Sequence, residues 1–301
     1  MKLGHLAPLL LAVASLAAGC GATARSAGAG GLQVVAAENF WGSIAAQLAG
    51  SKATVHSIIV NPAQDPHSYE PTAADARMLA AAQLTIVNGI GYDPWASQLL
   101  AANPSSGRIV LTVGDLFGLR ERDNPHRWYD PTDVEAVANV VAANLKKLDP
   151  KHASYYNRQR ATFERHSLAR YHQAIAAIRK RYAGVPVGAS ESIFALQAPA
   201  LALRLITPYS FMKAISEGTD VSAQDAATVE RQLTQDEIRV WIYNTQNATP
   251  EIQSLNALAR QHGIPVATVT ETLLPARDSF EQWQLLQPQR IERALHQATG
   301  R

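Results

Sequence analysis

Four side chains that can bind a metal ion each follow an apolar, strand-like run of this 301-residue chain. Two are the histidines His67 and His126, both in proline-bounded turns, and two are the carboxylates Glu191 and Glu271. In open α/β sheets, ligands bind beyond the carboxyl ends of the strands, where such side chains can meet. Two neutral imidazoles and two carboxylates carry a charge of about −2, which one divalent cation would offset. These nitrogen and oxygen ligands suit zinc or manganese better than magnesium or calcium.

Each of these residues also has a structural interpretation. A histidine in a turn, such as His67 or His126, can simply be solvated. Ser190 can cap a helix, with Glu191 stabilised in its first turn by the helix dipole, and Glu271 can be a solvated loop carboxylate. The sequence contains no His-Glu-x-x-His word and no paired cysteines, so spacing alone is weak evidence for a metal site.

The elements that must position these residues alternate between short strands and helices, which predicts parallel sheets covered by helices on both faces. In the first half we expect strands at 33–37, 55–60, 84–87 and 108–113, and helices at 39–48, 71–82, 94–102 and 131–148. In the second half we expect strands at 185–189, 238–243 and 266–269, and helices from about 191 and at 222–235, 250–261 and 280–296. Pro288 should kink or divide the last of these helices.

The alternation stops between Lys151 and Tyr182, where the sequence has neither strand signals nor Gly or Pro. A helix of that length would run about 45 Å, which is more than one small sheet can pack against. We therefore expect a connecting helix at 151–183 between an N-terminal α/β lobe at 32–150 and a C-terminal α/β lobe at 184–301, with the metal site in the cleft.

The N-terminus has the layout of a bacterial lipoprotein signal. One positive charge, a short apolar run and small residues lead to Cys20, the single cysteine of the chain. We predict a signal peptide at 1–19, lipidation of Cys20 and a flexible Gly- and Ala-rich tether at 20–31. A plain secretory signal with an incidental cysteine is the alternative, because Leu16 lies four residues before the cysteine rather than three.

Composition excludes several classes of protein. Hydrophobic residues make up 47% of the chain, too many for a disordered protein. The 27 Lys and Arg against 25 Asp and Glu give a net charge of +2, too balanced for a nucleic-acid binder or a polybasic membrane binder. One cysteine also rules out an internal disulfide framework and a Cys-rich metal site.

Three stretches of sequence resemble the metal-ion solute-binding proteins of bacterial ABC importers, the zinc and manganese family. They are Asp65–Thr72 (DPHSYEPT), Asn88–Gly89 with Tyr92–Trp95 (YDPW), and Asn124–Pro131 (NPHRWYDP). The resemblance covers nearly the whole mature chain. It implies that His67, His126, Glu191 and Glu271 bind the metal, with Glu271 at a position where the family commonly has Asp.

The resemblance also implies what the protein does. We expect a monomeric, extracytoplasmic lipoprotein, anchored to the cell membrane through Cys20, that captures one zinc or manganese ion and delivers it to an ABC permease. It would be neither an enzyme nor a nucleic-acid binder. Glu at position 191 is commoner in manganese members of the family. The segment 119–124 also lacks the His-rich loop of some zinc members, so the metal stays open.

Other functions remain open on the sequence. A mononuclear metallohydrolase would use Glu191 or Glu271 as a base and leave a coordination position for water. A binder of siderophore-type ligands would share the two-lobe plan, but gives no reason for two proline-bounded histidines. Some family members are described as surface adhesins, and no feature of this sequence argues for that independently.

Overall fold

The computed structural model describes Met1 and residues 31–301, and residues 31–301 form one compact unit. Apart from Met1, the predicted signal peptide lies outside the described residues, as do Cys20 and all of the tether except its last residue. Within the part of the chain that is described, none of the helices has the length and apolar content needed to cross a membrane.

The first half of the unit is built on a parallel four-stranded sheet with the order β2-β1-β3-β4. Its strands are β1 (Leu32–Glu38), β2 (Ala53–Ile59), β3 (Leu84–Val87) and β4 (Ile109–Thr112). Its helices are α1 (Asn39–Ala49), α2 (Ala73–Ala81), α3 (Pro94–Ala102), α4 (Val113–Leu116) and α5 (Pro131–Leu148), with short 3-10 turns η1 (Gly50–Lys52), η2 (Pro66–Ser68) and η3 (Arg127–Tyr129). β3 is buried along its whole length, as expected for a central strand covered on both faces.

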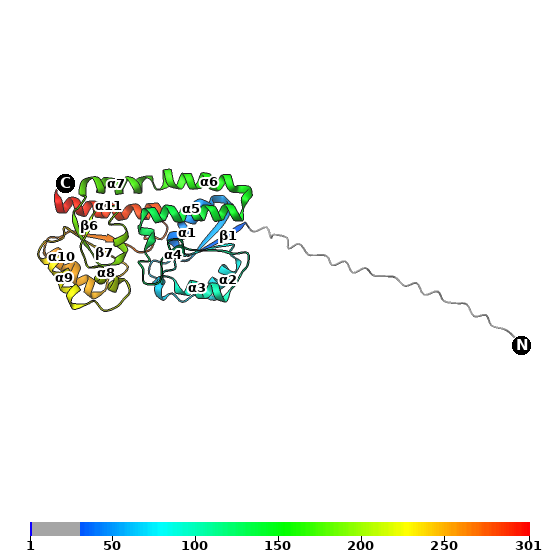
Figure 1. The fold of residues 1–301 in the computed structure, drawn as a ribbon, viewed down its shortest axis with the longest axis horizontal. Coiled ribbons are helices and arrows are strands. Elements are labelled where there is room, and N and C mark those ends of the chain that lie inside the picture. Colours follow the sequence, from blue (N-terminus) through cyan, green and yellow to red (C-terminus); the bar gives the residue numbers. More distant parts are fainter. Residues whose placement is uncertain (2–30) are drawn as a thin grey trace. The chain divides into compact units, whose positions relative to one another are not determined.

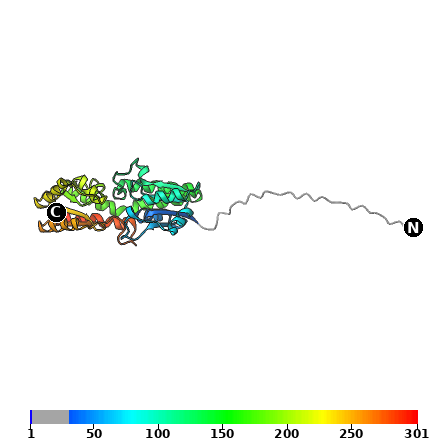
Figure 2. The same cartoon turned by 90° about the horizontal axis from the view of Figure 1, so that it is seen from below.

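The second half repeats this plan with a parallel sheet of order β6-β5-β7-β8. Its strands are β5 (Pro186–Ala189), β6 (Arg204–Leu205), β7 (Val240–Asn244) and β8 (Val266–Val269). Its helices are α8 (Tyr209–Ser216), α9 (Ala223–Thr234), α10 (Pro250–Gln261) and α11 (Phe280–Thr299), with a 3-10 turn η6 (Ser192–Leu196) after β5. The predicted fold of two α/β lobes is confirmed, and Figure 2 shows the two groups of elements side by side.

One nearly continuous helical stretch joins the two halves and runs along one edge of the unit, past both sheets (Figure 1). It consists of the 3-10 turn η4 (Pro150–His152), α6 (Ala153–Thr162), a π-helical turn η5 (Phe163–Ser167) and α7 (Ala169–Tyr182). The predicted connecting helix is therefore present, with a π turn near its middle.

The last helix also contacts the first half of the unit. The backbone N–H of Phe280, at the start of α11, donates to Ser43 Oγ (2.8 Å), and Gln47 Nε2 donates to Glu281 Oε2 (2.7 Å). Both Ser43 and Gln47 lie on α1. Two long elements therefore span the two sheets, and the division of the chain at 151 and 183 remains a proposal.

Several local expectations were wrong. α2 begins at Ala73, because Thr72 and Asp75 form a capping box there, and Pro71 lies outside the helix. The segment after Glu191 forms a 3-10 turn and not the expected α-helix. The strand β6 and the helix α8 were not predicted. Pro288 does not divide α11, since the buried residues on both sides of it pack against the same core.

The largest hydrophobic core runs continuously through both halves. Trp128 and Tyr129 of η3 meet the second half directly: Trp128 Nε1 donates to the carbonyl of Glu271 (3.0 Å), and Tyr129 Oη donates to that of Thr270 (2.7 Å). The ring of Tyr129 packs edge-on against Trp283 of α11. These buried contacts hold the end of β8 against the first half, at the base of the cleft.

Candidate metal centre

The four predicted site residues lie beyond the carboxyl ends of four strands. His67 is in η2, which follows β2, and His126 immediately precedes η3, which follows β4 and α4. Glu191 is two residues beyond β5, and Glu271 is two residues beyond β8. This is the edge at which parallel sheets bind their ligands.

His126 is buried (2% exposed) and lies opposite Glu271, with 3.8 Å between its Nε2 and Glu271 Oε1. Its other ring nitrogen, Nδ1, lies 2.9 Å from Asn124 Oδ1, which also accepts the backbone N–H of His126. Because Asn124 Oδ1 accepts hydrogen bonds, Nδ1 carries the proton and Nε2 has the free lone pair. Burial lowers the pKa of His126, so its imidazole is neutral and able to bind a metal.

Glu271 is held by partners from both halves of the unit. Tyr92 Oη donates to Oε1 (2.9 Å), and Asn244 Nδ2, at the end of β7, donates to Oε2 (3.2 Å). Burial alone would raise the pKa of Glu271, but its interaction with His126, the electrostatic effect of His67 and the hydrogen bond from Tyr92 lower that pKa below the ordinary value. Glu271 is therefore charged at neutral pH.

Glu191 is buried (3% exposed), and Asn247 Nδ2 donates to its Oε1. Burial and the nearby charge of Glu271 raise the pKa of Glu191 to about 8, even though hydrogen bonds from Asn244 and Asn247 lower it. Two carboxylates in one low-dielectric site repel each other, and a cation between them would remove that repulsion. This acidic half of the site is therefore suited to a positive ligand.

His67 lies on the opposite wall and is exposed to solvent. Its ring packs edge-on against Tyr92, with 4.8 Å between the ring centres. It lines a cavity of about 440 Å³ together with Gln246, Asn247 and Glu271, and a smaller one of about 140 Å³ together with His126. His67 therefore stands where the two cavities meet, at the mouth of the site.

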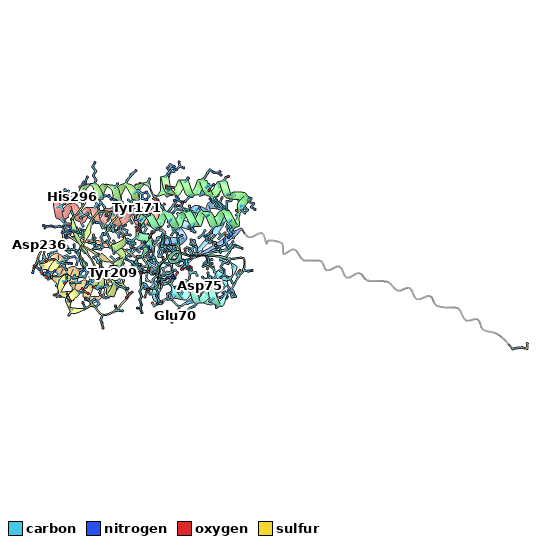
Figure 3. All side chains as sticks on the ribbon, viewed as in Figure 1. Glu70, Asp75, Tyr171, Tyr209, Asp236 and His296 are labelled. Atoms are coloured by element: carbon cyan, nitrogen blue, oxygen red, sulfur yellow. The ribbon has the colours of Figure 1, made fainter. Side chains whose placement is uncertain are left out.

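The loop that carries His67 is fixed by two aspartates. Asp65 Oδ1 accepts the backbone N–H of His67 (2.9 Å). Asp75 of α2, labelled in Figure 3, accepts hydrogen bonds through Oδ2 from Tyr69 Oη (2.9 Å) and from the backbone N–H of Thr72 (2.7 Å). The Pro-His-Ser-Tyr-Glu-Pro word is thus a rigid turn, which explains how an exposed histidine keeps a defined position.

The structure brings His126 and Glu271 together and places Glu191 beside them, while His67 packs against Tyr92 at the mouth of the site. Among the described residues, no three His, Cys, Asp or Glu side chains are close enough as they stand to hold a metal ion. Asn247 and Tyr92 hold carboxylate oxygens that would have to turn toward an ion. The fourfold ligand set therefore remains a prediction.

Sequence reasoning missed the polar residues that hold these side chains. Asn244 ends β7, between the strands that precede Glu191 and Glu271, so the strand-end rule that found the carboxylates also applies to it. Asn124 lies two residues before His126, within the Asn-Pro-His word. Tyr92 was noted only as part of a motif, and its hydrogen bond across the cleft carries no local signal.

Comparison with known proteins adds independent findings. The model of a family described as zinc-uptake complex component A, periplasmic (ZnuA), matches residues 34–294. The manganese-binding lipoprotein MntA of Halalkalibacterium halodurans is 32% identical over 154 residues, 49% of this chain and 51% of the relative. The metal ABC transporter substrate-binding lipoprotein SsaB of Streptococcus sanguinis is 32% identical over 192 residues, 60% of this chain and 59% of the relative. The chain thus spans about half the length of the curated relatives it matches.

Solved structures share the fold over nearly their whole length. The manganese-bound form of a mutant periplasmic metal-binding protein of Candidatus Liberibacter asiaticus has a TM-score of 0.75 and 18% sequence identity. The match covers 88% of this chain and 99% of that protein. At 18% sequence identity the comparison supports the two-lobe fold but not the assignment of individual site residues.

Proposed function

This chain belongs to the zinc-uptake complex component A family, and on that premise we propose that it captures one divalent transition metal ion for an ABC importer. The cargo is manganese or zinc, and the partner that receives it is the membrane permease of the importer. The names of the relatives support this, since one is a manganese-binding lipoprotein and the other a substrate-binding lipoprotein of a metal ABC transporter.

The observation that carries the proposal is the meeting of His126 and Glu271 across the cleft. A neutral imidazole with a free Nε2 lies 3.8 Å from a charged carboxylate, in a buried site next to a second carboxylate, Glu191. We propose that Glu191 and His67 complete the set of ligands. Four protein ligands leave no coordination position for a reacting water, so the site suits capture and release and not catalysis.

We also propose that the protein works outside the cytoplasm as a lipoprotein. The single cysteine, Cys20, directly follows the small residues of a signal-like N-terminus. Incorporation of labelled fatty acid into the protein, and its loss in a Cys20→Ser variant, would test the anchor separately from the metal site.

The metal site is tested by truncating its histidines in the chain from Gly21 to Arg301. His126→Ala and His67→Ala should each weaken binding of manganese and zinc by at least about 100-fold, since even the loss of a residue that only supports a ligand costs about 10–100-fold. His262→Ala, an exposed histidine at the end of α10, is the matched control and should bind like the parent. Isothermal titration with each metal measures all three variants.

Thermal unfolding separates loss of the site from loss of the fold. Both variants should remain folded without metal, and added metal should raise the melting temperature of the parent and of the control alone. If the double variant bound both metals like the parent, the site would be wrong. If the parent bound neither metal, metal capture itself would be wrong.

A further inference from the structure

The connecting helix carries a concentrated positive charge. Between residues 151 and 182 the sequence has eight Lys or Arg and a single Glu. Since the whole chain has 27 Lys and Arg and 25 Asp and Glu, the rest of it holds 19 basic and 24 acidic residues. The near-neutral net charge argues against a polybasic membrane binder, but it is an average over two unlike parts. The connecting helix is strongly basic, and the rest of the chain is acidic.

The basic side chains lie on the solvent side of this helix. Tyr156, Phe163 and Tyr171, the last labelled in Figure 3, are buried on its other side. Besides Arg181, six basic residues of the stretch are exposed: Lys151, Arg158, Arg165, Arg170, Arg179 and Lys180. Lys151 lies in η4, Arg158 on α6, Arg165 in the π turn η5, and Arg170, Arg179 and Lys180 on α7, so the exposed charges are spread along the whole stretch. These six residues are called the basic face below.

Few acidic groups neutralise the basic face. The neighbouring Arg160 and Arg181 form ion pairs with Glu164 (3.0 Å) and Glu292 (3.6 Å). For the six residues of the basic face, no ion pair is found among the described residues. Their positive charges therefore face solvent and are available to a negatively charged partner.

The basic face and the metal cavity lie on different sides of the unit. Figure 1 shows α6 and α7 along one edge, whereas α8 lies toward the other. The end of α8, at Ile215 and Ser216, lines the larger cavity, together with the loop that carries His67. A partner on the basic face would thus leave the entrance of the cavity open.

The described chain starts beside this helix. Gly31 packs near the carbonyl of Lys52, and Lys52 Nζ lies 5.7 Å above the ring of Tyr155 on α6. Only the segment 21–31 separates Cys20 from β1. At about 3.3–3.6 Å per residue, eleven residues reach at most about 40 Å. A lipid on Cys20 would therefore keep the basic face within reach of the membrane surface.

We propose that the basic face of α6 and α7 docks on the anionic headgroups of the membrane that anchors the protein. Clusters of four to eight Lys and Arg near a membrane attract anionic lipids, and the attraction acts within about 10 Å of the surface at moderate salt. The choice of a membrane as partner depends on the proposed lipid anchor, but not on metal capture. In this orientation the metal cavity opens toward the solution from which the ion arrives.

The test uses the unlipidated chain from Gly21 to Arg301, which includes the whole compact unit, so that only the protein surface can bind. Vesicles of equal parts phosphatidylglycerol and phosphatidylcholine should bind it, and vesicles of phosphatidylcholine alone should not. The triple variant Arg158→Glu, Arg165→Glu, Arg170→Glu should bind the anionic vesicles at least about tenfold more weakly. High salt should weaken binding of the parent in the same way.

A matched control separates the basic face from net charge. Arg77→Glu on α2, Arg204→Glu on β6 and Arg260→Glu on α10 change the same total charge at exposed positions outside α6 and α7, and should leave most vesicle binding intact. Equal losses in both triple variants would overturn the proposal, as would binding to heparin without binding to anionic vesicles, which would point to a soluble polyanion. Metal titration of the same samples shows whether metal capture survives independently.

Discussion

The two sheets have the same strand order, yet the buried carboxylates at equivalent strand ends have different surroundings. Glu38 ends β1 and Glu191 follows β5, and each of these strands is second in its sheet. Both side chains are almost fully buried, and both have a raised pKa because of burial and a neighbouring carboxylate. The neighbour of Glu38 is Asp93, and that of Glu191 is Glu271.

The difference between the pairs lies in what else they meet. Asp93 accepts the backbone N–H groups of Asn88 and Gly89 (2.7 Å each), so it fixes the turn that leads to Tyr92. Gly89 suits this turn because its φ is +72° and a Cβ there would come within 2.7 Å of Thr112. Glu271 instead faces His126 and lines a cavity. Burial at a strand end is therefore not enough for a metal site, which also needs an imidazole and an opening.

The strongest test of this comparison exchanges one carboxylate of each pair for its amide. Glu271→Gln should weaken metal binding by at least about 100-fold, because it removes the charge of a proposed ligand. Glu38→Gln should change the affinity by less than about threefold, below the loss expected for a residue that supports a ligand, since Glu38 neighbours Asp93 and none of the proposed ligands. Isothermal titration with manganese and zinc measures both variants. If Glu38→Gln weakened binding as much as Glu271→Gln, the two pairs would not differ in function.

Much of the fold could be predicted because its signals are local. The bounds of β3, α3, α5, α10 and β8 agree with the sequence prediction residue for residue. Three of these elements, α3, α5 and α10, begin with a proline in the first helical turn, which marks the start of a helix directly. The two-residue β6 and the course of α11 through Pro288 depend on tertiary packing, which a local pattern does not contain.

For the candidate site, the sequence could predict which side chains take part but not how they contact one another. The strand-end rule pointed to His126 and Glu271, and the structure brings the two together. It could not show that Tyr92 Oη crosses the cleft to Glu271, because that contact joins residues 179 positions apart. The tautomer of His126 likewise follows from its contact with Asn124 and not from its place in the chain.

A smaller effect on metal binding is expected from the asparagines at the end of the third strand of each sheet, where Asn244 is the last residue of β7 and Asn88 directly follows β3. Asn244 donates to Glu271, so Asn244→Ala should weaken metal binding by about tenfold. Asn88 accepts from Trp41 Nε1 and donates to the carbonyl of Pro125 (3.0 Å each). Asn88→Ala should therefore lower the free energy of unfolding by about 1–3 kcal/mol and change the affinity less than Asn244→Ala does. Metal titration and urea unfolding measure both variants. If Asn88→Ala lost more metal affinity than Asn244→Ala, the comparison would be wrong.

The last prediction concerns the pH dependence of stability, with no effect expected on metal capture. In the unfolded chain Glu38 titrates near its ordinary value of 4.5, whereas burial and Asp93 raise its pKa in the folded protein. At a pH below the pKa of the unfolded chain, Glu38 is protonated in both the folded and the unfolded state. Its full contribution to the stability of the folded protein is then present. As pH rises, the unfolded state loses this proton first, so stability falls by about 1.4 kcal/mol for each unit of difference between the two pKa values.

Glu38→Gln replaces the titrating carboxyl group with an amide that does not titrate, and keeps the shape of the side chain. Urea unfolding from about pH 5 to about pH 8 should show the parent losing more stability than the Glu38→Gln variant as pH rises. Glu230→Gln on α9, an exposed glutamate, is the control and should follow the parent. Parallel curves for the parent and Glu38→Gln would mean that Glu38 is already ionised in the folded protein. The pair of Glu38 and Asp93 would then carry more negative charge than its surroundings indicate, and would be closer to the pair of Glu191 and Glu271.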